Sequence, residues 1–427
     1  MTEEFLLYIW QHKLFYSNNL SLTNKENIII NSTGIRNNDS GPDFFNAKIK
    51  LSNIEWIGNI EIHIKSSDWE KHKHQNNKNY DNIILHVVYE NDKNIFRKSG
   101  EVIPTLELKN KFNELIFEKY KELITSQRWI PCEYSIKTIE RFHFEMWLER
   151  MLVDRIEKKV DNIQKHFELN ISNWEQTFYE QLSSSFGFKV NSFAFEQLAK
   201  SIPIQYLGKH KNNQFQIEAL LFGQAGMLAK DFKDEYPKKL KTEYQILKTK
   251  YKLEPIEDEL WKFSKLRPSN FPTIRIAQLA SLIYNSTSLF SKIINSNSIR
   301  EIKTFFDVQM SEYWFEHYNF DKKTRVISNN LGNSSTNLII INTIIPFLYF
   351  YGKYYDNDIY KKRALYFMDL LPAEDNSIIR KFKELNINTS TAFRSQALLQ
   401  LKKEYCDKKK CLECGIGNIL LKTTFQK

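Results

Sequence analysis

The sequence predicts an α+β protein in which a small N-terminal α/β module precedes a large all-helical body. Apolar residues recur at every second position in much of residues 28–108, and at every third or fourth position in most of the chain that follows. Glycine and proline, which mark the frequent turns of all-β proteins, number only 12 and 10 among 427 residues. Because the chain is about three times as long as the commonest domain, changes of pattern divide it into segments 1–125, 126–300 and 301–427.

The N-terminal segment is predicted to contain a short helix and several strands. Residues 1–16 place apolar side chains at helical spacing. Apolar and charged residues alternate on both sides of the link SNIEWIG (52–58), which predicts a hairpin. The nearly continuous apolar run 82–92 predicts a strand near the middle of a sheet, covered on both faces. Pro104 favours an edge position for the strand 101–108.

The remainder of the chain is predicted to be helical, and its longest helix covers residues 136–167. The most apolar helix, 337–352, is shorter than the ~20 residues that span a bilayer. It also contains Asn342 and Pro346, so we expect a buried core helix and no membrane association. Further helices are expected at 173–186, 191–201, 215–228, 234–252, 272–290, 358–371, 376–385 and 391–405.

Composition restricts the partners and the compartment. A formal net charge of +10 permits a nucleic-acid partner, DNA in preference to RNA, without requiring one. The acidic start MTEEF argues against a secretory signal, which carries basic residues there. Four cysteines in so long a chain do not form a secreted disulfide framework. We therefore expect a cytoplasmic protein.

Asp43, Glu61, His63 and Lys65 are the strongest candidates for a catalytic site. Glu61, His63 and Lys65 share one face of the second hairpin strand, and Asp43 follows a Gly-Pro turn before the first. Two carboxylates held a few ångströms apart repel each other unless a cation neutralises them, and oxygen ligands suit Mg²⁺ or Mn²⁺. Such an ion polarises a phosphate and activates a bound water. The plainer interpretation is an amphipathic hairpin with polar residues on its outer face.

At these residues the sequence resembles the PD-(D/E)XK nuclease superfamily. Pro42 and Asp43 match its Pro-Asp element, and Glu61 to His63 match its acidic-x-Lys element. The resemblance implies a restriction-endonuclease-like N-terminal module and metal-dependent hydrolysis of nucleic-acid phosphodiesters. His63 stands where the family has lysine, which leaves three possibilities. His63 orients the water as a base, or Lys65 replaces the lysine, or the protein is a non-catalytic nucleic-acid-binding or assembly protein with a degenerate site.

Histidines near the hairpin indicate a different possibility, a zinc hydrolase. His86 interrupts the buried apolar run and needs a hydrogen bond or a metal. His72 and His74, in the Lys- and Asn-rich segment 66–82, can join His63 or His86 as zinc ligands. Otherwise these histidines are expected to contact nucleic-acid phosphate, or to lie in an ordinary solvated turn.

Arg267 and Arg275 are further candidates for phosphate binding. They flank a Pro-bounded turn that leads into a predicted helix. Helix N-termini and arginine side chains both bind phosphate. The simpler interpretation is a turn with ordinary surface arginines.

The four cysteines are predicted to bind a structural metal. Cys406, Cys411 and Cys414 have C-x4-C-x2-C spacing, and Cys132 lies just after the α/β module. Four thiolates complete a zinc site or bind an iron–sulfur cluster, and reduced thiols without a metal are the alternative. The arrangement resembles the cluster site of certain exonucleases of the same superfamily. The metal is expected to tie the C-terminus to Cys132 and to contribute to folding.

As a whole, the chain resembles a bacterial family of uncharacterised proteins. The motifs EIHIKSSDW, LRPSNFPTIR and CLECGIG carry the resemblance and are spread over the chain. It implies a domain of unknown function and brings no activity with it.

Overall fold

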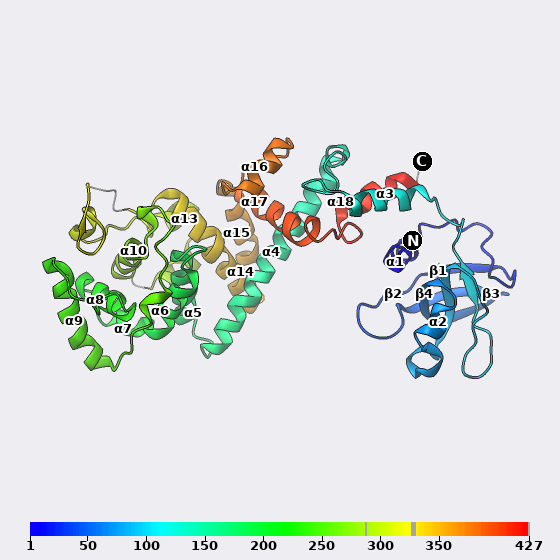
Figure 1. The fold of residues 1–427 in the computed structure, drawn as a ribbon, viewed down its shortest axis with the longest axis horizontal. Helices are drawn as coiled ribbons and strands as arrows, with labels where there is room; N and C mark the ends of the chain where they lie inside the picture. The colour runs from blue at the N-terminus through cyan, green and yellow to red at the C-terminus, as the bar shows by residue number, and fades with distance from the viewer. Residues whose placement is uncertain (287, 326–329, 426–427) are drawn as a thin grey trace. The chain divides into compact units, whose positions relative to one another are not determined.

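A computed structural model describes residues 1–286, 288–325 and 330–425 of the chain. It has a mixed α+β fold with a small sheet and a large helical body, as the sequence predicted (Figure 1).

The chain divides into two compact units. Unit 1 consists of Met1–Trp147 and Leu401–Lys427, and unit 2 consists of Leu148–Gln400. The predicted divisions near residues 125 and 300 therefore fall inside the units, and the C-terminal residues belong with the N-terminal module. The apolar period does not change at residue 148 or 401, because helical backbone runs through both points.

The sheet of unit 1 has six strands in the order β1-β3-β4-β5-β6, with β2 paired to β3. The pairs within β1 to β4 are antiparallel, whereas β4–β5 and β5–β6 are parallel. β5 has a strand on each side and is buried over most of its length, which confirms the predicted central strand. β6 follows Pro104 and lies at an edge of the sheet, which confirms the predicted edge strand. The strands are β1 (Ile28–Ser32), β2 (Ile35–Arg36), β3 (Phe44–Leu51), β4 (Ile54–Lys65), β5 (Ile83–Glu90) and β6 (Thr105–Glu107).

β3 and β4 form the predicted hairpin, with a tighter turn than expected. Leu51 pairs with Ile54, and the two residues between them, Ser52 and Asn53, have φ angles of 43° and 69°. Positive φ at both central residues is typical of two-residue hairpin loops, whose twist matches that of the strands. Most of the link SNIEWIG therefore belongs to β4, where Ile54 and Trp56 are exposed.

Three helices of unit 1 share one apolar core with the sheet: α1 (Glu3–Gln11), α3 (Leu115–Thr125) and α18 (Gly415–Phe425). The hydroxyl of Thr2 accepts the N–H of Phe5 and so caps α1. The Phe5 ring stacks on Tyr120 of α3, with centroids 5.2 Å apart. α18 runs beside α3 (Figure 1) and contributes Leu421 to the core. The short helix α2 (Asp68–Lys71) lies in the crossover from β4 to β5.

The described residues of unit 2 are helical apart from connections and one small hairpin, and helices occur at all the predicted positions, in some cases divided in two. The hairpin, β7 (His317–Asn319) and β8 (Lys322–Lys323), was not predicted. The long helix α4 (Arg141–Leu169) begins in unit 1 and continues in unit 2. The other helices are α5 (Trp174–Phe186), α6 (Ser192–Ser201), α7 (Ile204–Gly208), α8 (Gln214–Gln224), α9 (Glu235–Tyr251), α10 (Pro272–Asn285), α11 (Leu289–Asn295), α12 (Ile299–Thr304), α13 (Asn333–Ile339), α14 (Ile345–Tyr354), α15 (Asp358–Leu370), α16 (Ser377–Glu384) and α17 (Ala392–Gln400).

The most apolar helical stretch, Asn333–Tyr354, is a core helix of unit 2. Within the described part of the chain it alone is long and apolar enough to cross a membrane, yet 67% of its most apolar window is buried. A π-helical turn, η7 (Ile340–Ile344), separates α13 from α14. Pro346 lies two residues after this turn, in the first turn of α14.

Candidate metal centre

β3 and β4 bring two acidic side chains together at one end of the hairpin. Phe44 pairs with Ile60, so Asp43, which precedes β3, lies opposite Glu61. The backbone N–H of Asp43 donates to Glu61 Oε2 at 3.2 Å, and that of Ile62 donates to Asp43 Oδ2 at 2.8 Å. Each carboxylate is thus fixed by a backbone N–H of the segment opposite it. The two are neighbours, as expected.

These carboxylates hold protons more tightly than carboxylates in water. Burial, followed by repulsion from Glu61, raises the pKa of Asp43 to about 7. Burial raises the pKa of Glu61 to about 8, and the negative charge of Glu3 adds to the shift. A divalent cation bound here would replace these protons, because it would neutralise the two charges that burial and repulsion disfavour.

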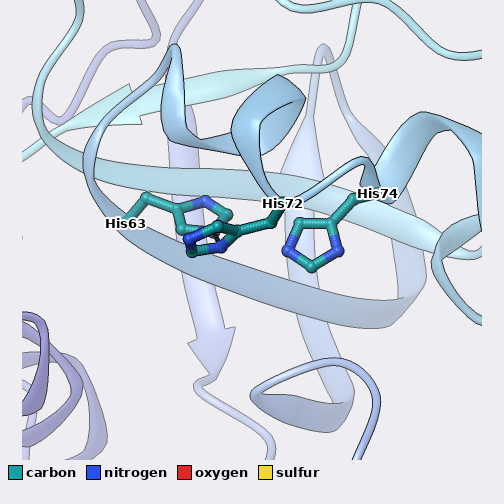
Figure 2. Close-up of side chains that lie close together, drawn as sticks. All are labelled: His63, His72 and His74. Carbon is teal, nitrogen blue, oxygen red and sulfur yellow. Dashed lines mark hydrogen bonds between the residues drawn. The ribbon is translucent and has the colours of Figure 1, made fainter.

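Three histidines lie close together beside the carboxylates. His63 projects from β4, and His72 and His74 follow α2 in the crossover to β5; Figure 2 shows the three rings turned toward one another. One ring nitrogen from each lies within 4.8 Å of the others, a spacing suitable for a shared metal ion. His63 is buried, His74 half-buried and His72 exposed, so the group reaches from the sheet to the surface.

A fourth histidine, His86, holds His63 from the other side. β4 and β5 are parallel and in register, with Glu61 opposite His86, and His86 is fully buried. His63 Nδ1 lies 2.8 Å from His86 Nε2, and His63 Nε2 lies 3.0 Å from His72 Nδ1. Burial, with a smaller effect of neighbouring imidazoles, lowers the pKa of His63 to about 2 and that of His86 to about 3. Both rings are therefore uncharged at neutral pH. The partner that the sequence required for His86 is His63.

Glu61 connects the carboxylates to the histidines. Its Oε1 lies 3.2 Å from His74 Nε2 and 3.7 Å from His63 Nε2. Although His74 Nε2 is this close to Glu61, the contact does not have the geometry of a hydrogen bond, so this buried nitrogen has no hydrogen-bond partner. The His74 ring stacks on Tyr80 with centroids 3.9 Å apart. Among the described residues, only imidazole nitrogens lie within ion-pair distance of the Glu61 carboxylate. His63, His72 and His74 could hold a metal here, because their ring nitrogens have the required spacing, and Glu61 Oε1 borders two of the three rings.

Three predicted site residues lie elsewhere. Lys65, at the end of β4, has an exposed side chain. Arg267 is exposed and belongs to unit 2. Arg275, also in unit 2, is buried: its guanidinium donates to Gln278, Asn270 and Ser335 and lies over the Phe188 ring. Arg275 thus has a packing role in α10.

Residues that sequence reasoning missed surround the same site. Glu3 of α1 is close enough for its charge to act on Asp43 and Glu61, and burial raises its own pKa. Trp69 and Tyr80 enclose His74 with their rings. The sequence MTEEF shows that acidic residues occur in α1. The apolar pattern does not show that α1 packs on β4, so it could not place Glu3 beside the site. The aromatic residues carry no signal, because Trp and Tyr are common in cores.

Fold and site together define a mixed α+β protein with a cluster of carboxylates and imidazoles at a sheet hairpin. The chain belongs to the family DUF2851, described as a protein of unknown function, whose family model matches residues 3–377. The match includes every carboxylate and histidine of the cluster and ends before Cys406. No curated protein and no solved structure matches the chain.

Proposed function

We propose that this protein is a metal-dependent phosphodiesterase that cleaves nucleic acid, with its divalent ion held between Asp43, Glu61 and the neighbouring histidines. One observation carries the proposal. Two carboxylates withdrawn from water lie beside three histidines whose ring nitrogens are within 4.8 Å of one another, and Glu61 Oε1 reaches two of these rings.

The ligand set favours a metal that accepts both oxygen and nitrogen. Carboxylates suit Mg²⁺ and Mn²⁺, whereas imidazoles suit zinc and other transition metals. We therefore place Mn²⁺ before Mg²⁺ and regard Zn²⁺ as its competitor. The bound ion polarises a phosphate oxygen and lowers the pKa of a coordinated water. Exposed His72 lies on the open side of the cluster, where a phosphate group can approach.

Two features support a nucleic-acid substrate. The order of elements, a helix, an antiparallel hairpin with Asp43 and Glu61, and a crossover to a parallel strand, agrees with the restriction-endonuclease-like module implied by the sequence resemblance. The net charge of +10 favours a polyanion. His63, in the position of the superfamily lysine, is bonded on both ring nitrogens, so its role is to hold His72 and not to carry charge.

The test is cleavage of labelled single-stranded DNA, double-stranded DNA and RNA with Mn²⁺, Mg²⁺ or Zn²⁺. We expect Mn²⁺-dependent cleavage that Glu61→Gln reduces at least ~100-fold, because a metal supplies several kcal/mol of transition-state stabilisation. Glu55→Gln is the matched control, since Glu55 lies on the same strand with an exposed side chain. Equal cleavage by wild type and Glu61→Gln would exclude this site. DNA binding without cleavage by the metal-loaded protein would instead support an assembly protein.

A second candidate function is a zinc hydrolase with another substrate. The favouring observation is that His63, His72 and His74 by themselves meet the spacing of a zinc site. This alternative predicts one zinc per chain, lost in His72→Asn and in His74→Asn, and no cleavage of any nucleic acid. Nuclease activity that persists after zinc is exchanged for Mn²⁺ would count against it.

A further inference from the structure

The four cysteines of the chain meet at one place in unit 1. Cys132 follows α3, Cys406 ends the π-helical turn η8 (Leu401–Cys406), and Cys411 and Cys414 precede α18. All four line one small cavity, together with Leu123 and Pro131. No disulfide joins them. The isolated cysteine and the distant trio are therefore parts of a single cluster.

The spacing of the sulfur atoms indicates which metal fits. A tetrahedral zinc site with bonds of ~2.3 Å holds its sulfurs about 3.8 Å apart. In the described part of the chain, the histidine group beside Glu61 is the one set of three or more ligand atoms that all lie within 4.8 Å of one another. No three of the four cysteine sulfurs therefore lie within 4.8 Å of one another. An iron–sulfur cluster, which also takes four cysteine ligands, holds them further apart.

Hydrogen-bond donors surround the sulfur of Cys414. The backbone N–H groups of Ile416 and Gly417, at the start of α18, donate to it. The buried indole N–H of Trp147 finds no oxygen or nitrogen acceptor and lies against the same sulfur. Donors directed at a sulfur stabilise its charged form, which is the form that binds metals.

Two glycines of the motif CLECGIG keep this arrangement close-packed. A Cβ at Gly415 would lie 2.5 Å from the Trp147 ring, and a Cβ at Gly417 would lie 2.1 Å from the carbonyl oxygen of Cys411. Neither position has room for a side chain. The motif is explained by contacts around the cysteines.

The cluster lies where the chain leaves and returns to unit 1. The chain passes into unit 2 after Trp147 and comes back at Leu401. Trp147 packs on Tyr405, with ring centroids 5.4 Å apart, and Lys409 Nζ donates to the carbonyls of Ile124 and Ser126 at the end of α3. The segments before and after the insertion thus touch around the cysteines.

We propose that Cys132, Cys406, Cys411 and Cys414 bind an iron–sulfur cluster that joins the two ends of unit 1 around the inserted unit 2. Each thiol releases its proton to solvent when its sulfur binds iron. The site is distinct from the carboxylate and histidine cluster, because the two share no residue.

The first test is metal analysis of the full chain purified without oxygen. We expect equal amounts of iron and acid-labile sulfide, little zinc, and the visible absorption of sulfur-to-iron charge transfer. Cys132→Ser should lose the iron and should be cut faster by protease within residues 401–427. Zinc without sulfide, no metal at all, or full iron in Cys132→Ser would each overturn the proposal.

Two further measurements keep the test decisive. If Cys132→Ser does not fold, wild-type protein is compared before and after oxidative loss of the iron, and protease cutting within residues 401–427 should become faster only after the loss. Unchanged cutting would contradict the joining role. Glu61→Gln should keep all its iron and sulfide, so a failure of the proposed nuclease site and a failure of this site give different results.

Discussion

At the scale of single residues, the chemistry of the hairpin depends on charges held away from water. Glu61 is buried, and burial raises its pKa and that of Asp43, whereas the pKa values of His63 and His86 are lowered. Without a metal, all four groups therefore favour their uncharged forms. The proposed divalent ion would reverse this preference for the carboxylates.

The first prediction concerns the stability of the metal-free protein. A carboxyl group with a raised folded-state pKa stabilises the fold fully below its unfolded pKa near 4, and this contribution is lost as the pH rises through about 7 and about 8. His63 and His86 act in the opposite direction, but only below their unfolded pKa of about 6.5. We expect the free energy of unfolding to fall by about 1–2 kcal/mol between about pH 6.5 and 8.5. Urea unfolding measures it, and Asp43→Asn should have the shallower slope. An identical slope in Asp43→Asn would contradict the shifted pKa values.

The second prediction concerns His86, whose Nε2 lies 2.8 Å from His63 Nδ1. Replacing it by Asn should weaken Mn²⁺ or Zn²⁺ binding about 10- to 100-fold, because second partners orient metal-binding imidazoles. Isothermal titration measures the change. His143→Asn is the control, since His143 is an exposed histidine of α4. Equal affinity in His86→Asn and wild type would mean that His63 does not support the metal.

Residue types and spacing predicted much of this site. Asp43 and Glu61 were expected to meet, because a hairpin places the start of one strand beside the other strand. One of the three possibilities for His63, a water-orienting base, requires titration near neutral pH, but His63 lies between two imidazoles in a buried site, which holds its pKa far lower. Alternation along β4 placed Lys65 on the face of Glu61, but the strand leaves the core before Lys65, whose side chain is exposed.

At the scale of elements, unit 2 is held together partly by a buried carboxylate. Glu218 of α8 is completely buried and accepts hydrogen bonds from Tyr236 of α9, Ser311, and the indole of Trp314 in η6 (Glu312–Phe315). Burial raises its pKa, and these donors oppose the rise. A buried acceptor of this kind stabilises the contact of three elements only while its donors are present.

The third prediction follows from this contact. Tyr236→Phe removes one donor from Glu218, and we expect it to lower the free energy of unfolding by about 1–3 kcal/mol, because a buried carboxylate is left less satisfied. Denaturant unfolding of the full chain measures it. Tyr366→Phe is the matched control, since Tyr366 is exposed on α15 of the same unit. A loss no larger than that of the control would show that Glu218 does not depend on Tyr236.

Helices and strands were predicted better than the turns and irregular segments between them. Strong periodicity identified β4, β5 and the helices of unit 2, because burial on one face requires it. The turn at Ser52 and Asn53 was missed, since neither residue is the glycine that usually marks such a turn. The hairpin of β7 and β8 was missed because its strands have only three and two residues. The π-helical turn before Pro346 leaves no trace in the apolar pattern.

At the scale of the whole molecule, the chain returns to the unit in which it began. Residues 401–427 belong with residues 1–147, and helical backbone runs through both ends of the insertion, at residues 148 and 401. Apolar periodicity reports local structure only, so it could not predict that the chain returns to unit 1. The cysteines did indicate this return, because Cys132 and the C-terminal trio make a complete ligand set only if the two segments meet.

The central claim is that the hairpin of unit 1 holds a divalent ion. The most direct measurement is an equilibrium titration with Mn²⁺ of wild type, Glu61→Gln and Glu55→Gln. The electron paramagnetic resonance signal of the free ion reports how much Mn²⁺ is bound. We predict one tight Mn²⁺ site per chain in wild type and in Glu55→Gln, and its loss in Glu61→Gln. A tight site that survives in Glu61→Gln, or no tight site in wild type, would contradict the claim.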